Sequence, residues 1–386
     1  YNGTGEFESS SAIQNWIMPY WNAFSKVRIT GMRMLAVLLL LLGTAAAKKK
    51  DLTQVLELPK EPPAATVGET RYLVFHVSPL IAKGLLSQQI REGMKSLLKE
   101  NAGAAIIRVR AFVAGTGDMR RVPALVSEIM TDKKLALPAV SVVQVGGLPM
   151  EGAQVVLESI SVSKKEVNPG GLLFVGGQEA ALAQPLQPVL PLAEQALARL
   201  DGVLSGSQAV RVTCFTSSTE EALKLQAVVS RRYPQAAVDV VTVQRAMARS
   251  LVNCEATARL PQREFKVNGR EATPVLAQRI AFTGTQLAFG FEENDARLAF
   301  QRIEKALEPL GASTKTVAMA NFYPLSGSIG EQVRKIRLEV FDPAAPPAFT
   351  LLPFEGLPSL DASFAVDVAA VVTKVVTKDV TKQLQK

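Results

Sequence analysis

The chain repeats one apolar stretch three times, and its first copy reads Ile107-Arg108-Val109-Arg110-Ala111-Phe112. The matching stretches run from Val210 to Phe215 and from Val317 to Phe322. Their closing phenylalanines lie 103 and 107 residues apart. Short apolar runs of this kind are typical of buried β-strands, and a regular period indicates a repeated structural unit. We therefore expect three units of similar order in one chain.

Other landmarks recur at matched offsets around each stretch. A short strand comes first, with a phenylalanine at 75, 174 or 282, and a helix with apolar residues at three-and-four spacing follows it. A second helix and a proline come after the central stretch. An acidic residue lies 20 or 21 residues beyond that proline, in the order Glu158, Glu255 and Asp367. The sequence thus predicts a strand-helix-strand-helix-strand unit at residues 70–163, 167–261 and 275–372.

The connections between these units are polar. Residues 164–166 and the stretch from Pro261 to Pro274 are predicted to be linkers, and residues 373–386 a basic tail. Within unit two, Ser217-Ser218-Thr219-Glu220 is typical of a helix N-cap. The second helices are expected at residues 122–130, 222–231 and 331–338.

The first 47 residues have a pattern of their own. Residues 1–31 show neither a helical nor a strand period. From Met32, a basic residue, the apolar run Leu35 to Leu42 and three alanines before Lys48 are typical of a signal peptide at 32–47. The apolar run is far shorter than the ~20 residues that cross a bilayer as a helix. We expect an exported protein, secreted or periplasmic, that begins at Lys48 when mature and has no membrane span.

The composition excludes several classes of protein. With 48% hydrophobic and 20% charged residues among 386, the chain is not disordered, collagen-like or a coiled coil. One histidine, His76, and two cysteines leave too few ligands for a zinc or iron-sulfur site, so we expect no metal and no cofactor. His76 itself is predicted to be an ordinary strand residue. Cys214 and Cys254 fit either a disulfide or two buried thiols, and the sequence leaves both open.

The formal net charge is +8. The Lys and Arg residues are spread along the chain rather than gathered with aromatic residues, as a nucleic-acid platform requires. We therefore read the charge as solubilising and expect no nucleic-acid partner.

Several of these motifs resemble the RidA/YjgF family of enamine and imine deaminases. The stretches at residues 174–178 and 282–286, Phe-Val-Gly-Gly-Gln and Phe-Thr-Gly-Thr-Gln, are similar to the family's Phe-x-Gly-x-Gln signature, and unit one adds Pro138-Ala139-Val140-Ser141 and Glu158-Ser159-Ile160. The resemblance implies a chorismate-mutase-like α+β fold, in which two helices cover one face of each mixed sheet. Family members are homotrimers with clefts between subunits. Three tandem units therefore imply a monomeric, single-chain pseudo-trimer with a small-molecule ligand.

The resemblance also implies site residues. In the family an arginine grips the substrate carboxylate and a glutamate positions the attacking water, roles that suit a bidentate guanidinium and a carboxylate base. Loss of the guanidinium removes a charge-assisted pair worth roughly 1.5 to 3 kcal/mol. By resemblance the catalytic acids are Glu158, Glu255 and Asp367. The family's arginine positions, two residues after the proline, hold Val140, Ala236 and Phe349.

Two functions of different class follow. One is a hydrolytic deaminase of small imines or enamines, of the 2-iminobutanoate/2-iminopropanoate type, without the usual carboxylate clamp. The other is a non-catalytic ligand-binding or scaffold protein, in which the acids are tied to backbone or to an arginine of the neighbouring unit. RNA cleavage is disfavoured by the single histidine. The arginines nearest the expected sheets are predicted to be exposed strand residues rather than cleft residues: Arg108, Arg110, Arg211 and Arg245.

Overall fold

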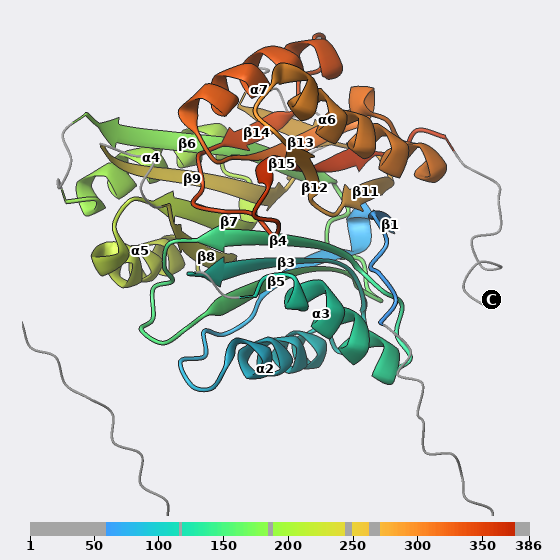
Figure 1. Cartoon of the computed structure of the whole chain (residues 1–386), viewed down its shortest axis with the longest axis horizontal. Helices are drawn as coiled ribbons and strands as arrows, with labels where there is room; N and C mark the ends of the chain where they lie inside the picture. The colour runs from blue at the N-terminus through green and yellow to red at the C-terminus, as the bar shows by residue number, and fades with distance from the viewer. Residues whose placement is uncertain (1–58, 116–117, 184–187, 244–248, 262–270, 375–386) are drawn as a thin grey trace, which may run out of the picture. The chain divides into compact units, whose positions relative to one another are not determined.

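A computed structural model describes residues 59–115, 118–183, 188–243, 249–261 and 271–374 of the chain. Within these ranges the strands form three sheets of four, five and six strands, and two α-helices pack on one face of each sheet (Figure 1). The chain is therefore a mixed α+β protein. The predicted signal peptide, the segment before it and most of the predicted tail lie outside the described residues.

The first sheet has the strand order β2-β5-β3-β4, and its central strand β3 is antiparallel to β5 and parallel to β4. Both predicted helices of this unit are present. In chain order the elements are β2 (Leu73–Val77), α2 (Leu86–Glu100), β3 (Ala105–Ala114), α3 (Arg121–Asp132), β4 (Ala139–Val145) and β5 (Val155–Val162).

The second sheet has the order β10-β6-β9-β7-β8. Most of its edge strand β10 lies in the stretch that the sequence predicts to be a linker. This part of the stretch is a strand because it pairs with β6. The elements are β6 (Leu172–Leu182), α4 (Leu190–Leu204), β7 (Gln208–Thr216), α5 (Thr219–Arg232), β8 (Ala237–Thr242), β9 (Ser250–Arg259) and β10 (Ala272–Val275).

The third sheet has the order β1-β11-β15-β13-β14, and β12 also pairs with β15. Its edge strand β1 precedes the first unit in sequence and so ties the start of the described chain to the last sheet. The elements are β1 (Ala65–Glu69), β11 (Arg279–Thr283), β12 (Gln286–Phe289), α6 (Glu293–Leu307), β13 (Val317–Pro324), α7 (Gly327–Val340), β14 (Ala348–Leu351) and β15 (Ala362–Val371), with short 3-10 turns at Thr70–Tyr72, Glu308–Leu310 and Thr314–Thr316.

The three sheets share one register around their central strands. Each central strand, β3, β7 or β13, has an irregularity at the same place in its pairing with the acid-bearing strand. Beyond it, the predicted acids occupy the same position in every sheet. Arg110 stands opposite Glu158, Thr213 opposite Glu255, and Asn321 opposite Asp367.

Two details differ from the sequence prediction. Each sheet has a further strand, parallel to the central one, where only an extended segment is predicted: β4, β8 and β14. The structure also corrects one of the three matched arginine positions. Val238, and not Ala236, pairs with its central strand at the place where Val140 and Phe349 pair with theirs. A turn that includes Ala236 follows α5, and the strand begins only at Ala237.

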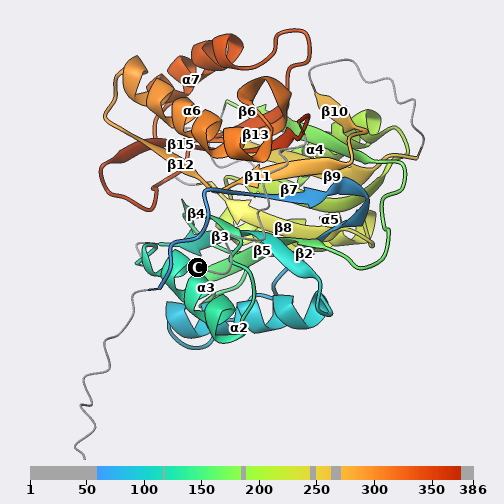
Figure 2. The same ribbon diagram turned by 90° about the vertical axis from the view of Figure 1, so that its right-hand side faces the viewer.

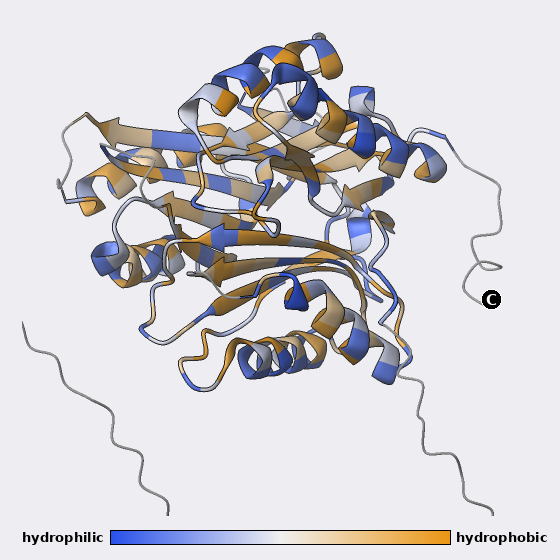
Figure 3. Ribbon diagram, viewed as in Figure 1, coloured by the Kyte–Doolittle hydropathy of each residue, from blue (hydrophilic) through white to orange (hydrophobic). Residues whose placement is uncertain are grey.

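Each sheet is buried on both faces. Side chains alternate along a strand, so Val109, Ala111 and Val113 of β3 pack beneath α2 and α3. From the other face, Phe112 joins a core that also contains Phe215 of the second sheet and residues of the third. The views in Figures 1 and 2 show the helices outside and the strands toward one another. Figure 3 shows the matching hydropathy, with apolar strands and hydrophilic residues over much of the helices.

Serine caps begin two of the helices. The predicted N-cap is confirmed at Ser218, whose Oγ accepts a 3.3 Å hydrogen bond from Glu221 N at the start of α5. Ser326 caps α7 in the same way, with Ile329 N as the donor at 3.3 Å. None of the helices in the described ranges is long and apolar enough to cross a membrane.

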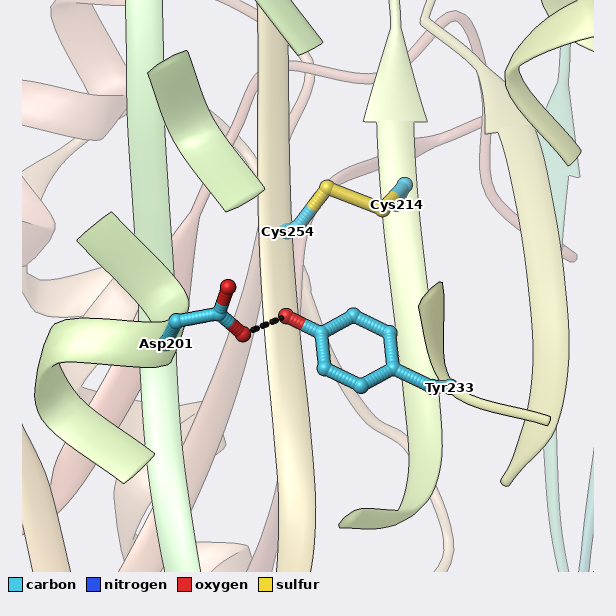
Figure 4. The surroundings of a disulfide bond; sticks show 4 residues. All are labelled: Asp201, Cys214, Tyr233 and Cys254. Atoms are coloured by element: carbon cyan, nitrogen blue, oxygen red, sulfur yellow. Dashed lines mark hydrogen bonds between the residues drawn. A yellow bond between two sulfur atoms is a disulfide. The ribbon is translucent and has the colours of Figure 1, made fainter. Parts of the chain in front are cut away.

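Cys214 and Cys254 form a disulfide, which settles the alternative that the sequence leaves open. The two residues stand opposite each other on β7 and β9, and both are fully buried in the core of the second sheet (Figure 4). Nearby, the Tyr233 hydroxyl donates a 2.6 Å hydrogen bond to Asp201. In the chain-entropy account, a bridge across 40 residues contributes about 4 kcal/mol to stability.

Candidate functional site

The three predicted catalytic acids lie together on the inner faces of the sheets. Glu158 on β5, Glu255 on β9 and Asp367 on β15 are 4%, 2% and 0% exposed. One guanidinium links all three. Arg110 Nη1 lies 3.6 Å from Glu158 and 3.8 Å from Glu255, and its Nη2 lies 3.3 Å from Asp367.

The expectation of exposed strand arginines is wrong for three of the four. Arg108, Arg110 and Arg211 are 5%, 2% and 8% exposed. Their strand positions point them inward, and acids of the other sheets compensate their charge there. Arg108 pairs with Asp367, and Arg211 pairs with Glu158. The fourth, Arg245, lies outside the described residues.

Neutral donors complete the binding of Asp367. Its carboxylate accepts hydrogen bonds of 3.0 Å from Asn321 and 2.7 Å from the Tyr323 hydroxyl. Burial alone would raise the pKa of Asp367, but Arg108 and Arg110 outweigh it and hold that pKa below its usual value. Asp367 is therefore an ionised member of the network.

The pKa values of the two glutamates shift in opposite directions. Burial would raise the pKa of Glu158, but Arg211 and Arg110 outweigh burial, so the pKa lies below its ordinary value. The Thr213 hydroxyl also donates a 3.2 Å hydrogen bond to Glu158. Burial raises the pKa of Glu255 overall, because Arg110 and Arg211 oppose it less strongly. Glu255 accepts its closest hydrogen bond, of 2.5 Å, from Thr350 of the third sheet.

This arrangement holds charged groups against one another rather than against a ligand. Every acid of the network contacts a side chain from another sheet. The cavities that adjoin the arginines measure about 10 and 20 Å³, and a single water already needs roughly 10 to 15 Å³. No imine or enamine fits there. Among the described residues, no three His, Cys, Asp or Glu side chains gather as metal ligands.

A much larger cavity, of about 660 Å³, opens between the first and second sheets. Its walls come from the end of β2 and the turn after it, from α5, and from the start of β8. Within the described part of the chain, neither arginine nor lysine lines it. The lining mixes apolar side chains with six polar or charged ones: His76, Ser78, Glu100, Gln226, Gln235 and Asp239.

His76 is part of this cavity wall, a placement that the sequence does not predict. Its Nδ1 lies 3.6 Å from a carboxylate oxygen of Glu100, which also lines the cavity. Burial lowers the pKa of His76 and Glu100 only partly offsets this, so the imidazole is neutral at pH 7. It can therefore donate or accept a hydrogen bond to a ligand.

Asp239 of β8 joins the cavity to the charged network. It is 4% exposed, lines the cavity, and has an Oδ2 without a hydrogen-bond partner among the described residues. Burial raises the pKa of Asp239 well above its usual value, and the charge of Glu158 and a hydrogen bond with it raise it further. Burial and the neighbouring Glu158 thus favour the protonated form of the Asp239 carboxyl. An acid inside the apolar run Ala237 to Thr242 is the signal that could have revealed it.

Asp239→Asn should make the stability less dependent on pH. The folded protein keeps a proton on Asp239 that the unfolded chain releases above about pH 4. The wild type therefore loses stability as the pH rises from about 4 through the raised pKa of Asp239, and the amide avoids this loss. In urea unfolding at pH 5 and pH 8, the variant should gain on the wild type at pH 8. An equal difference at both pH values would contradict this assignment.

The corresponding edges between the other sheets are closed by the signature glycines. A Cβ placed on Gly176 would lie 2.7 Å from the carbonyl oxygen of Phe349, and one on Gly284 would lie 2.7 Å from that of Val140. At the third edge, Val77 of β2 and Val238 of β8 instead line the large cavity. Of these three edges, as far as the described ranges extend, the third is the one open to a ligand.

Gly176→Ala should lower the free energy of unfolding by about 1 to 3 kcal/mol, because the methyl group meets the Phe349 backbone. Gly202→Ala is the matched control. Gly202 lies in α4 with open space where the added methyl group would lie, so alanine should raise stability by about 0.5 to 1 kcal/mol. Urea unfolding measures both. A stabilising Gly176→Ala would show that this edge is loosely packed.

No known family profile matches the sequence, and no curated protein matches it. Among solved structures, a member of the YjgF/YER057c/UK114 family from Mycobacterium tuberculosis is 19% identical over 24% of this chain and 79% of its own, with a TM-score of 0.23. TdcF of E. coli with bound serine is 18% identical over 28% and 97%, with a TM-score of 0.22. Cyanuric acid hydrolase from A. caulinodans is 10% identical over 78% and 100%, with a TM-score of 0.21. At these TM-scores we infer neither fold nor activity from the likenesses.

Proposed function

We propose that the chain is an exported, RidA-like protein of three tandem units, folded as a single-chain pseudo-trimer. It binds a small uncharged or cationic molecule in the 660 Å³ cavity between units one and two. The acids Glu158, Glu255 and Asp367 hold the three units together in this proposal. The export step rests on the predicted signal peptide alone.

The repeated register supports the three-unit part of the proposal. In each sheet the central strand lies between a parallel neighbour and the antiparallel strand that carries the acid, and the acid occupies the equivalent position. Each also carries two helices on one face and needs another layer on the other. The neighbouring sheets supply that layer through the shared cores.

The observation that carries the ligand class is the absence of arginine and lysine from the cavity lining that the described residues form. A carboxylate ligand would lie there without a cationic partner and close to the acidic residues Glu100 and Asp239. Removing the carboxylate from water without pairing its charge is costly. A neutral amide or an ammonium group instead meets His76, Ser78 and Asp239 as hydrogen-bonding partners.

Val238→Arg tests this directly, because it puts a guanidinium in the wall of the open cavity. NMR titration of the wild type with butanamide and with propylammonium should shift resonances of the cavity residues, whereas 2-oxobutanoate should not. The variant should gain 2-oxobutanoate binding by about tenfold or more, from a charge-assisted pair. Leu298→Arg, on the exposed side of α6, is the control and should change nothing. Wild-type binding of 2-oxobutanoate as tight as that of butanamide would refute the ligand class.

A second candidate, hydrolytic deamination, is favoured by the raised pKa of Asp239 in the cavity wall. A neutral carboxyl in the cavity wall can protonate a leaving amine, and Asp239 is the acid that lines the cavity with a raised pKa. Ammonia release from freshly generated 2-aminoacrylate tests it. Turnover that Asp239→Asn abolishes and Val238→Arg increases would favour the enzyme, and no turnover by the folded wild type would exclude this substrate.

A further inference from the structure

A small cavity lies among the three sheets, on the arginine side of the charged network. It measures about 20 Å³ and is lined by Arg108, Arg110 and Arg211, with Thr257 and Asn321 as the other polar side chains. The remaining lining residues of the described chain are apolar, and none is acidic. The side chains of three arginines, whose guanidinium groups stay charged at physiological pH, therefore line one small space.

The acids of the network leave part of these guanidinium groups unpaired. Asp367 accepts a hydrogen bond from Arg108 Nη2. Glu158 accepts hydrogen bonds from Nε and Nη2 of Arg211. Arg108 Nε and Arg110 Nε have no hydrogen-bond acceptor within the described part of the chain, and Arg110 Nη1 reaches its nearest carboxylate oxygens only at 3.6 and 3.8 Å. Each such buried donor costs stability. Two of the three arginines that line the cavity thus keep donors without a hydrogen-bond acceptor.

We propose that this cavity binds a monoatomic anion, a halide such as chloride, between the guanidinium groups of Arg108, Arg110 and Arg211. A halide accepts hydrogen bonds from any direction, so it suits donors that come from two different strands. The volume limits the choice, since about 20 Å³ holds one or two water-sized spheres. Sulfate and phosphate, each with four oxygens, are too large.

The charge balance of the network favours an added anion. Arg108, Arg110 and Arg211 carry three positive charges at any physiological pH, and a buried charge needs a partner. Asp367 and Glu158 provide two negative charges at their other ends. The third acid, Glu255, approaches Arg110 only at 3.8 Å, and burial raises the pKa of its carboxyl. The anion would supply the missing acceptor on the side that lacks carboxylates.

Bromide makes the site visible. The whole chain would be purified and crystallised with sodium bromide as the only halide, and anomalous diffraction measured at the bromine edge. We expect a peak between the three guanidinium groups, and crystals from chloride should show the same feature without the bromine signal. An ordered water or protein atoms alone at that position, without an anomalous peak, would overturn the proposal.

Thermal unfolding gives a second, solution readout. At matched ionic strength, the melting temperature should rise saturably with sodium chloride or bromide compared with sodium gluconate. The double variant Arg211→Met/Glu158→Gln removes one guanidinium together with its acid and should abolish most of this rise. Arg232→Gln, which removes a surface guanidinium paired with Asp201, should keep it. Equal melting temperatures of the wild type in chloride and gluconate would refute the site.

Discussion

Glu158→Gln should lower the free energy of unfolding by about 3 to 5 kcal/mol in urea denaturation, the range for breaking a buried ion pair by removing one partner. The amide keeps the shape of the side chain but leaves Arg211, at 8% exposure, without its acid and removes one of the three acids that contact Arg110, at 2% exposure. It also leaves Thr213 without a charged acceptor. The loss should appear as a lower urea midpoint.

Glu128→Gln is the matched control for this change. Glu128 pairs with Arg91 at 3.0 Å, but both side chains are more than 40% exposed. Exposed pairs contribute about 0 to 1 kcal/mol, so this variant should unfold nearly as the wild type does. A Glu158→Gln protein as stable as the Glu128→Gln protein would show that the buried pair is not structural.

Asp367→Asn should cost about as much, 3 to 5 kcal/mol, because Arg108 loses its charged partner and Arg110 loses one of its three. The effect depends on pH in a defined direction. The pKa of Asp367 is lowered in the folded state, so its contribution is present above the unfolded value of about 4 and is lost as the pH falls through the folded value. The difference between wild type and variant should therefore narrow in acid.

Tyr323→Phe is the milder companion, useful if Asp367→Asn fails to fold. It removes one hydrogen bond of 2.7 Å to Asp367, worth about 1.5 to 3 kcal/mol when the acceptor is charged. Urea unfolding between pH 3 and pH 7 measures both variants. A constant difference between wild type and Asp367→Asn across this range would mean that Asp367 is not ionised in the folded protein.

The sequence predicts the helices and the central strands of all three sheets well, because each has a local apolar period. Even the acids Glu158, Glu255 and Asp367 are predicted at matched positions, and the strand register puts them there. The added strands β4, β8 and β14 are harder to predict. In the second sheet, the turn at Ala236 moves the register by two residues relative to the proline.

The charged network could not be predicted from local pattern. The partners of Arg108 and Arg211 lie 259 and 53 residues away in the chain. A strand arginine looks exposed when only its own sheet is considered, since its compensation comes from the facing sheet. The cavity could not be predicted for the same reason, because His76 and Asp239 come from different units and only the assembled sheets bring them to one wall.

The most direct test of the account is the double variant Glu158→Gln/Glu255→Gln, assayed for urea unfolding and for ammonia release from freshly generated 2-aminoacrylate beside the wild type. We expect a large loss of unfolding free energy and no change in ammonia release, because the acids connect the sheets and do not contact a ligand. A double variant that is as stable as the wild type but loses a turnover that the wild type shows would contradict the account.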